Sequence, residues 1–203
     1  MPNWCNNTIE IKGSTETIKK LWEEATAEGD EGGLLNAMAP MPKALNDTTS
    51  PTPQEGAANY KGAQPVVDGF DNWYDWRVSN WGCKWDVNTE GLEFHDHGDG
   101  TAEITGWFDS PWGPPIGAYE KFCDDMDGVY LEAYYEEGGM DFAGHWTSEG
   151  DDDYLEGISD YAREVIKNGE SGSSLYDFLD EHFEITENRR EYIEEELEEE
   201  LEN

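Results

Sequence analysis

The sequence predicts an α+β fold, a ferredoxin-like (split βαβ) antiparallel sheet with helices on one face, followed by a C-terminal helical segment. The first observation is the order of the segments, which runs strand, helix, strand, strand, helix, strand, strand, as in a split βαβ unit with an added edge strand. The second is a set of 9 Trp, 10 Tyr and 7 Phe, whose rings can build a core where aliphatic residues are scarce. The third is the length of 203 residues, which suits one substantial domain with an appendage.

The first strand and helix follow each other directly. Residues 8–13 alternate apolar and polar side chains and stop at Gly13, which predicts a strand. Ser14 is placed to cap a helix. The apolar face of this helix has the spacing i, i+3, i+4, i+7, formed by Ile18, Leu21, Trp22 and Ala25. Residues 40–65 contain five prolines and few apolar residues, and we interpret them as an inserted Pro/Gly-rich loop.

A tryptophan-rich segment covers residues 72–86, NWYDWRVSNWGCKWD. The step from Trp73 to Trp76 is helical, and the pair Trp81-Gly82 is typical of a helix end. A string of tryptophans is more often core than ligand platform. We therefore expect Trp81 and Trp85 of this segment, and Trp107 further along the chain, in the core.

The rest of the domain reads as two strand pairs separated by a helix. The first pair, 85–95 and 102–109, surrounds the turn at residues 97–100. Pro114-Pro115 begins a helix that reaches about Met126. The closing strand pair covers 129–136 and 140–148. From Asp151 the pattern becomes helical, so we divide the chain into a domain at 1–150 and an acidic helical extension at 151–203.

The charge excludes several classes of protein. Lys and Arg number 12 against 48 Asp and Glu, a net charge of −36. A basic face that grips nucleic acid or an anionic membrane is therefore excluded. The excess is concentrated toward the C-terminus, because residues 151–203 hold 20 acids and 4 bases. Like charges at i,i+4, such as Glu194 and Glu198, destabilise a helix. We therefore expect the acidic side chains of this segment to serve a function that offsets this cost.

Four motifs in the first three-quarters of the chain resemble the YubB-like family, ferredoxin-like domain proteins of phages, plasmids and other mobile elements. These motifs are MPNWCNNTIEIKG, NWYDWRVSNWGCKWD, FDSPWGPP and AYYEEGGMDFAGHW, in order within residues 1–148. The resemblance implies a ferredoxin-like fold and a mobile-element origin. It implies no catalytic residues, and it does not cover the acidic extension.

Catalytic and metal chemistry find little support in the sequence. A zinc site from Cys5, Cys83, His95 and His97 is disfavoured because no close Cys pair supplies the usual ligand spacing. Paired acids beside tryptophans are typical of sugar-cleaving sites, and the candidates are Asp75, Asp86, Asp109 and Asp141. With 48 acids some lie beside rings by number alone. We therefore expect no enzyme activity, no cofactor and no metal.

The function that the charge favours is imitation of nucleic acid. A cationic groove that binds phosphates gains the same counterion release when carboxylates enter it. We therefore expect a phage or plasmid protein that occupies the groove of a host DNA-binding or defence protein. The predicted acidic face consists of Asp151, Asp152, Asp153, Glu191, Glu194, Glu195, Glu198, Glu199 and Glu202, with contributions from Asp124, Asp125 and Asp127.

Two alternatives stay open. One is salt adaptation, in which acids only hydrate the surface. Salt adaptation predicts an even distribution of acids along the chain, and residues 1–60, with 9 acids and 4 bases, are less acidic than the rest. The other is a protein-binding or virion-assembly module that docks through the stripe Ile193, Leu197 and Leu201, through which two copies could also pair. The N-terminus does not resemble a signal peptide and no long apolar run occurs, so we expect a cytoplasmic protein with no membrane contact. The three cysteines fit reduced thiols.

Overall fold

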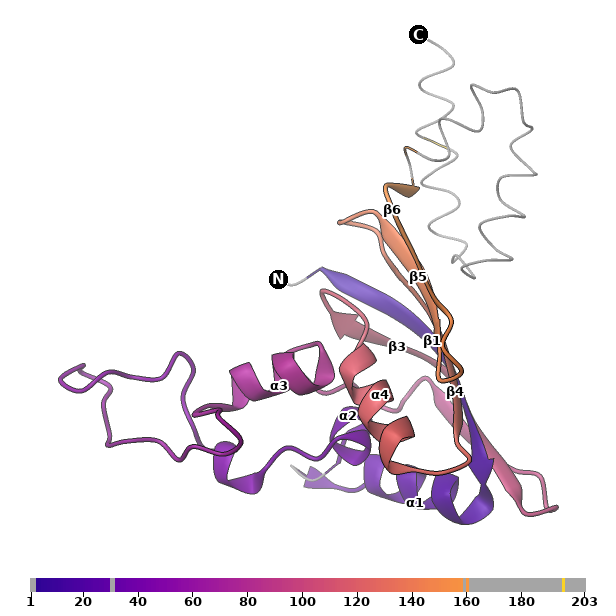
Figure 1. The fold of residues 1–203 in the computed structure, drawn as a ribbon, viewed down its shortest axis with the longest axis horizontal. Helices are drawn as coiled ribbons and strands as arrows, with labels where there is room; N and C mark the ends of the chain where they lie inside the picture. The colour runs from indigo at the N-terminus through magenta and orange to yellow at the C-terminus, as the bar shows by residue number, and fades with distance from the viewer. Residues whose placement is uncertain (1–2, 30–31, 159, 161–194, 196–203) are drawn as a thin grey trace, which may run out of the picture.

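Six antiparallel strands form one sheet in the order β2-β3-β1-β4-β5-β6 (Figure 1). The structure is a computed structural model that describes residues 3–29, 32–158, 160 and 195. The fold is therefore α+β, with an antiparallel sheet as the sequence predicts. The strands are β1 (Trp4–Ser14), β2 (Leu92–Asp96), β3 (Thr101–Pro111), β4 (Tyr130–Glu137), β5 (Phe142–Thr147) and β6 (Asp152–Glu156).

Four α-helices of the described residues lie on one side of this sheet (Figure 1). They are α1 (Thr15–Ala25), α2 (Leu34–Met38), α3 (Trp73–Trp81) and α4 (Ile116–Asp125), with a short 3-10 helix, η2, at Lys43–Leu45. None of the described helices is both long enough and apolar enough to cross a lipid bilayer.

Two helices have clear end residues, and two of these residues, Ser14 and Gly82, are predicted from the sequence. The hydroxyl of Ser14 accepts a hydrogen bond from the Thr17 N–H at 3.1 Å and caps α1. The side chain of Asn72 caps α3 in the same way, through the Asp75 N–H at 2.9 Å. Gly82 ends α3 with φ at 91°, a left-handed conformation that glycine adopts without steric cost.

The core lies between the helices and one face of the sheet. Alternate residues of β1, Ile9 and Ile11, point into it, and Ile18 and Leu21 of α1 cover them. Trp81 is fully buried, and its indole N–H donates a hydrogen bond to the Ala39 carbonyl at 2.7 Å. The prediction that Trp81 belongs to the core is therefore confirmed.

The helical structure expected from Asp151 is wrong for residues 152–156. This segment is strand β6, which pairs antiparallel with β5 from Trp146 to Phe142. Without β6, the outer backbone groups of β5 would be unpaired at the edge of the sheet. Tyr154 and Leu155, which the sequence placed on one helical face, lie on opposite faces of the strand.

The inserted loop projects from the body of the domain (Figure 1). Its two ends are held together by Gln64, whose amide N–H₂ donates to the carbonyls of Thr49 at 3.0 Å and Asp71 at 2.9 Å.

The strand predicted at 85–95 is shorter than expected, because β2 begins only at Leu92.

Candidate functional site

The sheet has a second face on which no described helix lies, and this face is acidic. Because alternate residues of a strand point to opposite sides, the neighbours of the buried residues point to this face. Glu10 lies between buried Ile9 and Ile11, and Glu103 between buried Ala102 and Ile104. We call the set the acidic sheet face, and it consists of Glu10, Glu93, Glu103, Asp109, Glu132 and Asp153.

The strand register brings these carboxylates close together. Glu10 of β1 lies directly opposite Glu132 of β4, and Glu103 of β3 lies opposite Lys12 of β1. Neighbouring strands are about 4.8 Å apart, and alternate residues along a strand are about 6.7 Å apart. The acids therefore occupy sites of a two-dimensional grid, and directly opposed like charges such as Glu10 and Glu132 oppose folding.

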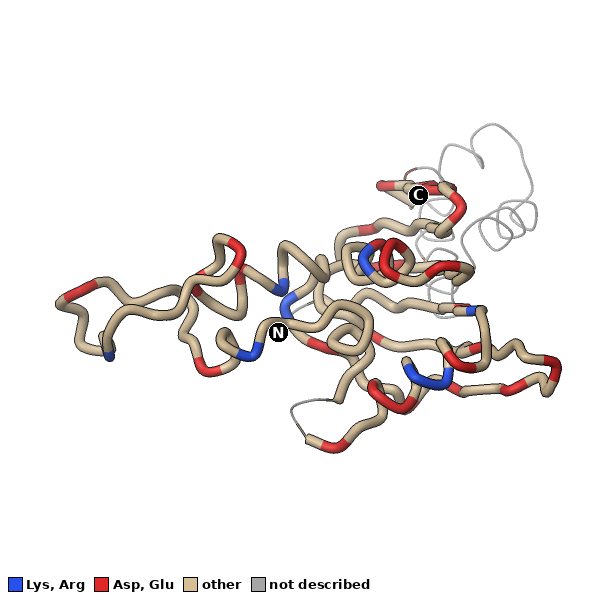
Figure 2. Tube along the Cα trace, turned by 60° about the horizontal axis from the view of Figure 1, so that its bottom comes forward, with Lys and Arg blue, Asp and Glu red and all other residues tan. Residues whose placement is uncertain are grey.

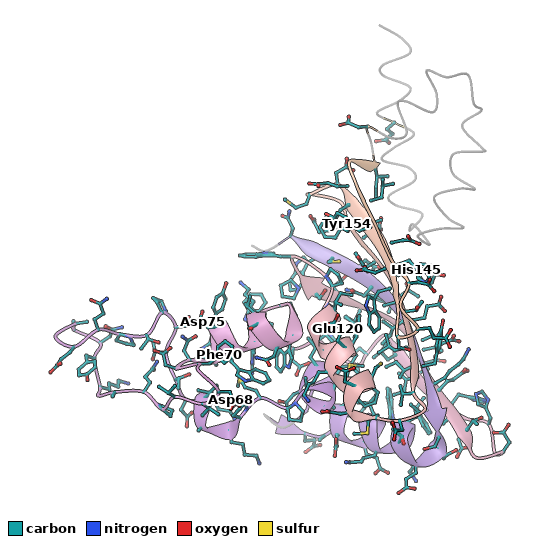
Figure 3. The ribbon with its side chains drawn as sticks, in the orientation of Figure 1. Asp68, Phe70, Asp75, Glu120, His145 and Tyr154 are labelled. Carbon is teal, nitrogen blue, oxygen red and sulfur yellow. The ribbon has the colours of Figure 1, made fainter. Side chains whose placement is uncertain are left out.

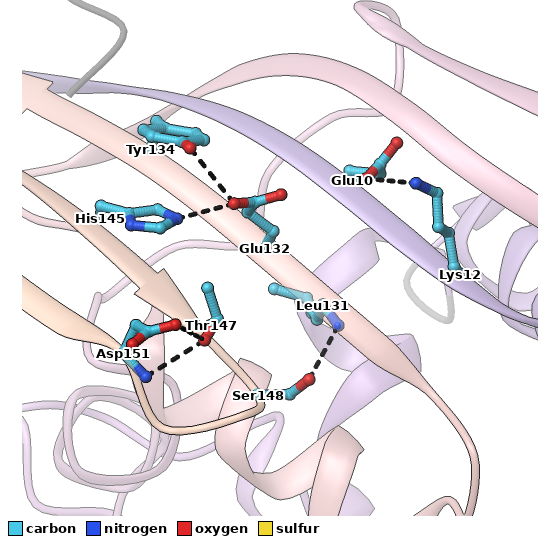
Figure 4. Close-up of polar contacts among 9 residues, drawn as sticks. All are labelled: Glu10, Lys12, Leu131, Glu132, Tyr134, His145, Thr147, Ser148 and Asp151. Atoms are coloured by element: carbon cyan, nitrogen blue, oxygen red, sulfur yellow. Dashed lines mark hydrogen bonds and ion pairs between the residues drawn. The ribbon is translucent and has the colours of Figure 1, made fainter. Parts of the chain in front are cut away.

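One lysine lies within this face. The Nζ of Lys12 is 2.6 Å from Glu10 (Figure 4). The hydrogen bond to Glu10 raises the pKa of Lys12, and the charges of Glu103 and Glu132 add to this effect. Three carboxylates of this face therefore favour the charged form of Lys12.

Glu132 is held in place by two ring-bearing residues (Figure 4). Its Oε1 accepts a hydrogen bond from the Tyr134 hydroxyl at 3.2 Å and lies 2.8 Å from Nε2 of His145. The two rings stack with centroids 4.2 Å apart. His145 points away from the helix side of the sheet, on which Glu120 of α4 lies (Figure 3).

The structure brings two groups of the predicted acids to one end of the sheet. Asp124, Asp125 and Asp127 are exposed at the end of α4 and in the turn that follows it. Asp151 directly precedes β6, in the turn after β5, and this turn lies beside the start of β4 because the Ser148 N–H donates to the Leu131 carbonyl at 2.8 Å. Asp152 and Asp153 are exposed on β6. Acidic residues also occur on other sides of the molecule (Figure 2), so charge alone does not single out a face.

Glu195 is exposed. The other predicted acids of the C-terminal segment lie outside the described residues: Glu191, Glu194, Glu198, Glu199 and Glu202. The predicted docking stripe also lies outside them: Ile193, Leu197 and Leu201.

Four tryptophans are exposed near the end of the sheet where β1 begins and β3 ends. The exposed fractions are 51% for Trp4, 40% for Trp85, 55% for Trp107 and 55% for Trp112. The expectation that Trp85 and Trp107 belong to the core is therefore wrong. Trp107 points to the acidic side because its neighbour Phe108 points into the core, and Trp85 follows the turn at Gly82 and lies against Trp4, with ring centroids 6.3 Å apart.

A cavity of about 570 Å³ lies between Trp4 and Trp107. Its acidic lining residues are Asp86, Glu90 and Asp109. Of the four acids considered for sugar cleavage, only Asp86 and Asp109 line this cavity. Asp75 is bonded to Asn72 at the start of α3, and Asp141 lies in the turn between β4 and β5.

Asp86 joins the tryptophan-rich loop to α2. Its carboxylate accepts hydrogen bonds from the backbone N–H groups of Leu35 at 2.8 Å, Asn36 at 2.9 Å and Val87 at 2.8 Å. Burial raises the pKa of Asp86, and these three hydrogen bonds partly oppose that rise. Residue 33 is Gly because a Cβ there would overlap the Asp86 carboxylate.

The four residues considered for zinc are not arranged as ligands. Cys5 and Cys83 are buried in the core. The rings of His95 and His97 pack edge to face, with centroids 4.8 Å apart, at the β2–β3 hairpin. Within the described part of the chain, no group of three or more His, Cys, Asp and Glu side chains is placed to hold a metal ion.

The fold and these surfaces define an α+β protein with an acidic, tryptophan-flanked sheet face. No family model and no curated protein matches the chain. A solved structure to which it is similar is protein api92 from Yersinia pseudotuberculosis, described by the DUF1281 family model. The two are 12% identical with a TM-score of 0.44, over 77% of this chain and 98% of that one. The resemblance to YubB-like proteins stays a prediction from the sequence motifs.

The sequence interpretation missed the acidic sheet face. The signal was present in the strands, because Glu10 and Glu132 each lie between two residues of the apolar alternation. The predicted acidic face was chosen by charge density along the chain, whereas the sheet collects acids from strands that are distant in sequence.

Proposed function

We propose that this chain imitates nucleic acid and occupies the cationic groove of a host DNA-binding or defence protein, acting by binding and not by catalysis. The observation that carries the proposal is the grid of carboxylates on the acidic sheet face, with Glu10 opposite Glu132. Each strand of B-DNA presents one negative charge about every 3.4 Å of axis. Carboxylates spaced by a few ångströms on a rigid sheet offer a basic groove a comparable density of charge.

The cost of this arrangement supports a role in binding. Opposed like charges destabilise a sheet by roughly 0.2–1 kcal/mol. Lys12, whose Nζ is 2.6 Å from Glu10, offsets part of this cost, as the lysine partners of Glu23 and Glu24 do on α1. The exposed acids near the end of the sheet, including Asp125 and Asp151, belong to the same proposal, as do the acids of the C-terminal segment.

The finer fold assignment is also a proposal. We propose that β1–β4, α1 and α4 form a ferredoxin-like core, to which β5 and β6 are added at one edge. The order β2-β3-β1-β4 and the antiparallel pairing of each neighbour support this assignment. With the motifs that resemble YubB-like proteins, it favours a mobile-element origin and action in the host cytoplasm.

The test is capture of proteins from a bacterial lysate on the immobilised full chain, followed by elution with duplex DNA. Nucleic-acid-binding proteins that are retained by the chain and released by the duplex support the proposal. The face variant replaces Glu10, Glu93, Glu103 and Glu132 by Gln. We expect this variant to lose the retained proteins, because binding that depends on many charges falls steeply when several are removed together.

A matched control removes the same charge elsewhere. It replaces by Gln four exposed acids of α1 and the following turn: Glu16, Glu23, Glu24 and Glu28. The control is expected to retain the proteins. Equal loss in both variants, or retention that duplex DNA does not reverse, contradicts the proposal. A chain that lacks residues 186–203 shows how much the C-terminal acids contribute, and full retention by it assigns binding to residues 1–185.

The same experiment separates the alternatives. Recovery of virion components that duplex DNA does not release favours an assembly module. If nothing is retained and the chain unfolds at low salt, its acidity is salt adaptation. The chain itself is expected not to bind duplex DNA, because its charge is −36.

A further inference from the structure

Arg77 of α3 is a cation without an anionic partner among the described residues, in a chain with 48 acids. Its guanidinium lies over the rings of Trp73, at 5.4 Å, and Trp81, at 4.7 Å. Its Nε is buried and donates no hydrogen bond to any described residue. No described carboxylate lies within the 4.0 Å of an ion pair with it.

The surroundings of Arg77 make this orphan donor costly. Burial lowers the pKa of Arg77, which means that the charge is partly removed from water. A buried charged donor without a partner costs more than an ordinary surface group. The cation–π contacts with two tryptophans offset part of this cost, but they provide no hydrogen-bond acceptor for the five N–H donors of the guanidinium.

The nearest acid does not provide the missing partner. Asp86 attracts Arg77 through charge, but both Asp86 oxygens accept hydrogen bonds from backbone N–H groups, two of which belong to α2. Asp86 is therefore fixed as a helix cap. Moving it to Arg77 would leave those N–H groups unpaired.

Arg77 faces a cavity of about 460 Å³ that is open to solvent. The rings of Trp73 and Trp85 form apolar walls, and the side chain of Asn46 adds an amide. Asp47 and Asp86 also line the cavity and make it unfavourable for a dianion. A planar donor between ring walls fits a planar monoanion, since guanidinium and carboxylate pair through two parallel hydrogen bonds.

We propose that this cavity binds a carboxylate carried on a flat apolar body, with Arg77 as the carboxylate-binding residue and Trp73 and Trp85 as the walls that hold the body. The site is separate from the acidic sheet face. It does not depend on the proposed imitation of nucleic acid.

The test uses the full chain and four probes: benzoate, its neutral analogue benzamide, acetate and inorganic phosphate. Binding is followed through the NMR signals of the tryptophan indole N–H groups. We expect benzoate to bind with millimolar or better affinity and shift the signals of Trp73 and Trp85. Benzamide lacks the charge and acetate lacks the ring, so each is expected to bind about tenfold more weakly.

Arg77→Gln is expected to weaken benzoate binding by about tenfold or more, and Arg77→Lys, which keeps the charge but not the fork, by less. Urea unfolding shows whether each variant is folded, and the comparison uses Arg77→Lys if Arg77→Gln is not. Equal binding of benzoate and benzamide, unchanged binding in a folded Arg77 variant, no saturable binding of benzoate, or tighter binding of phosphate than benzoate overturns the proposal.

Discussion

Asp86 allows a sharp test of how the tryptophan-rich loop is fixed to α2. Replacing Asp86 by Ala removes the acceptor of three backbone hydrogen bonds, from Leu35, Asn36 and Val87. Each unsatisfied N–H costs about 1–3 kcal/mol when water cannot replace the acceptor. Because Asp86 lines two cavities, water replaces part of the loss, and we expect a destabilisation of about 2–4 kcal/mol in total.

Asp86→Asn is expected to cost less than Asp86→Ala. Its Oδ1 keeps the hydrogen bonds from Leu35 and Val87, and only the Asn36 N–H faces an amide donor in place of an acceptor. The expected loss is therefore about 1–2 kcal/mol or less.

The pH dependence follows from the raised pKa of Asp86. A carboxyl whose pKa is raised in the folded state binds protons more tightly there than in the unfolded chain. Its contribution to stability is therefore present at low pH and declines as the pH rises from the ordinary value of 3.8 through the raised pKa. Asp86→Asn lacks this contribution, so the advantage of the wild type over Asp86→Asn should shrink as the pH rises.

Urea unfolding followed by tryptophan fluorescence measures these differences. Measurements at about pH 5 and pH 8 stay above the pI near 4.1, where a protein of low net charge precipitates. An advantage of the wild type over Asp86→Asn that grows with pH would falsify the assignment of the raised pKa. Equal stability of Asp86→Ala and the wild type would show that the three hydrogen bonds do not hold the loop to α2.

Three further predictions concern the packing of the sheet and the thiols. Gly144→Ala places a Cβ against the buried ring of Tyr135 and should destabilise the folded chain by about 1–3 kcal/mol. Tyr135→Ala should then cost less stability in the Gly144→Ala background than in the wild type. Additive losses of stability in urea unfolding would contradict the contact. Trp81→Phe leaves a void and leaves the buried Ala39 carbonyl unpaired. It should lower the melting temperature by about 2–4 °C for each kcal/mol of stability lost. An unchanged melting temperature would contradict the burial of Trp81. Burial raises the pKa of all three thiols, that of Cys123 to about 11, so Ellman's reagent at pH 8 should react slowly with the folded chain, with the half-exposed Cys123 first, and fully in urea. Fast reaction of all three in the folded state contradicts the structure.

The local elements could be predicted because they depend on neighbouring residues. Ser14 caps α1 through a bond to Thr17, and Gly82 ends α3 with a left-handed φ, and both effects act within one turn of helix. The alternation at residues 8–13 identified β1, although the strand begins earlier, at Trp4. Residues 152–156 could not be recognised as a strand, because what makes them one is the unpaired edge of β5.

The aromatic richness, the excess of acids and the positions of most helices and strands can be read from the sequence, since they follow from composition and from periods of two and 3.6 residues. Which tryptophans are buried depends instead on how the elements pack. Trp81, at the end of α3, is buried in the core, while Trp107 lies on the opposite side of the sheet because of its place in the alternation of β3. Strand pairing also decided that Glu10 and Glu132, more than a hundred residues apart, share one face. Such contacts are set by register between distant segments, which no local pattern in the chain encodes.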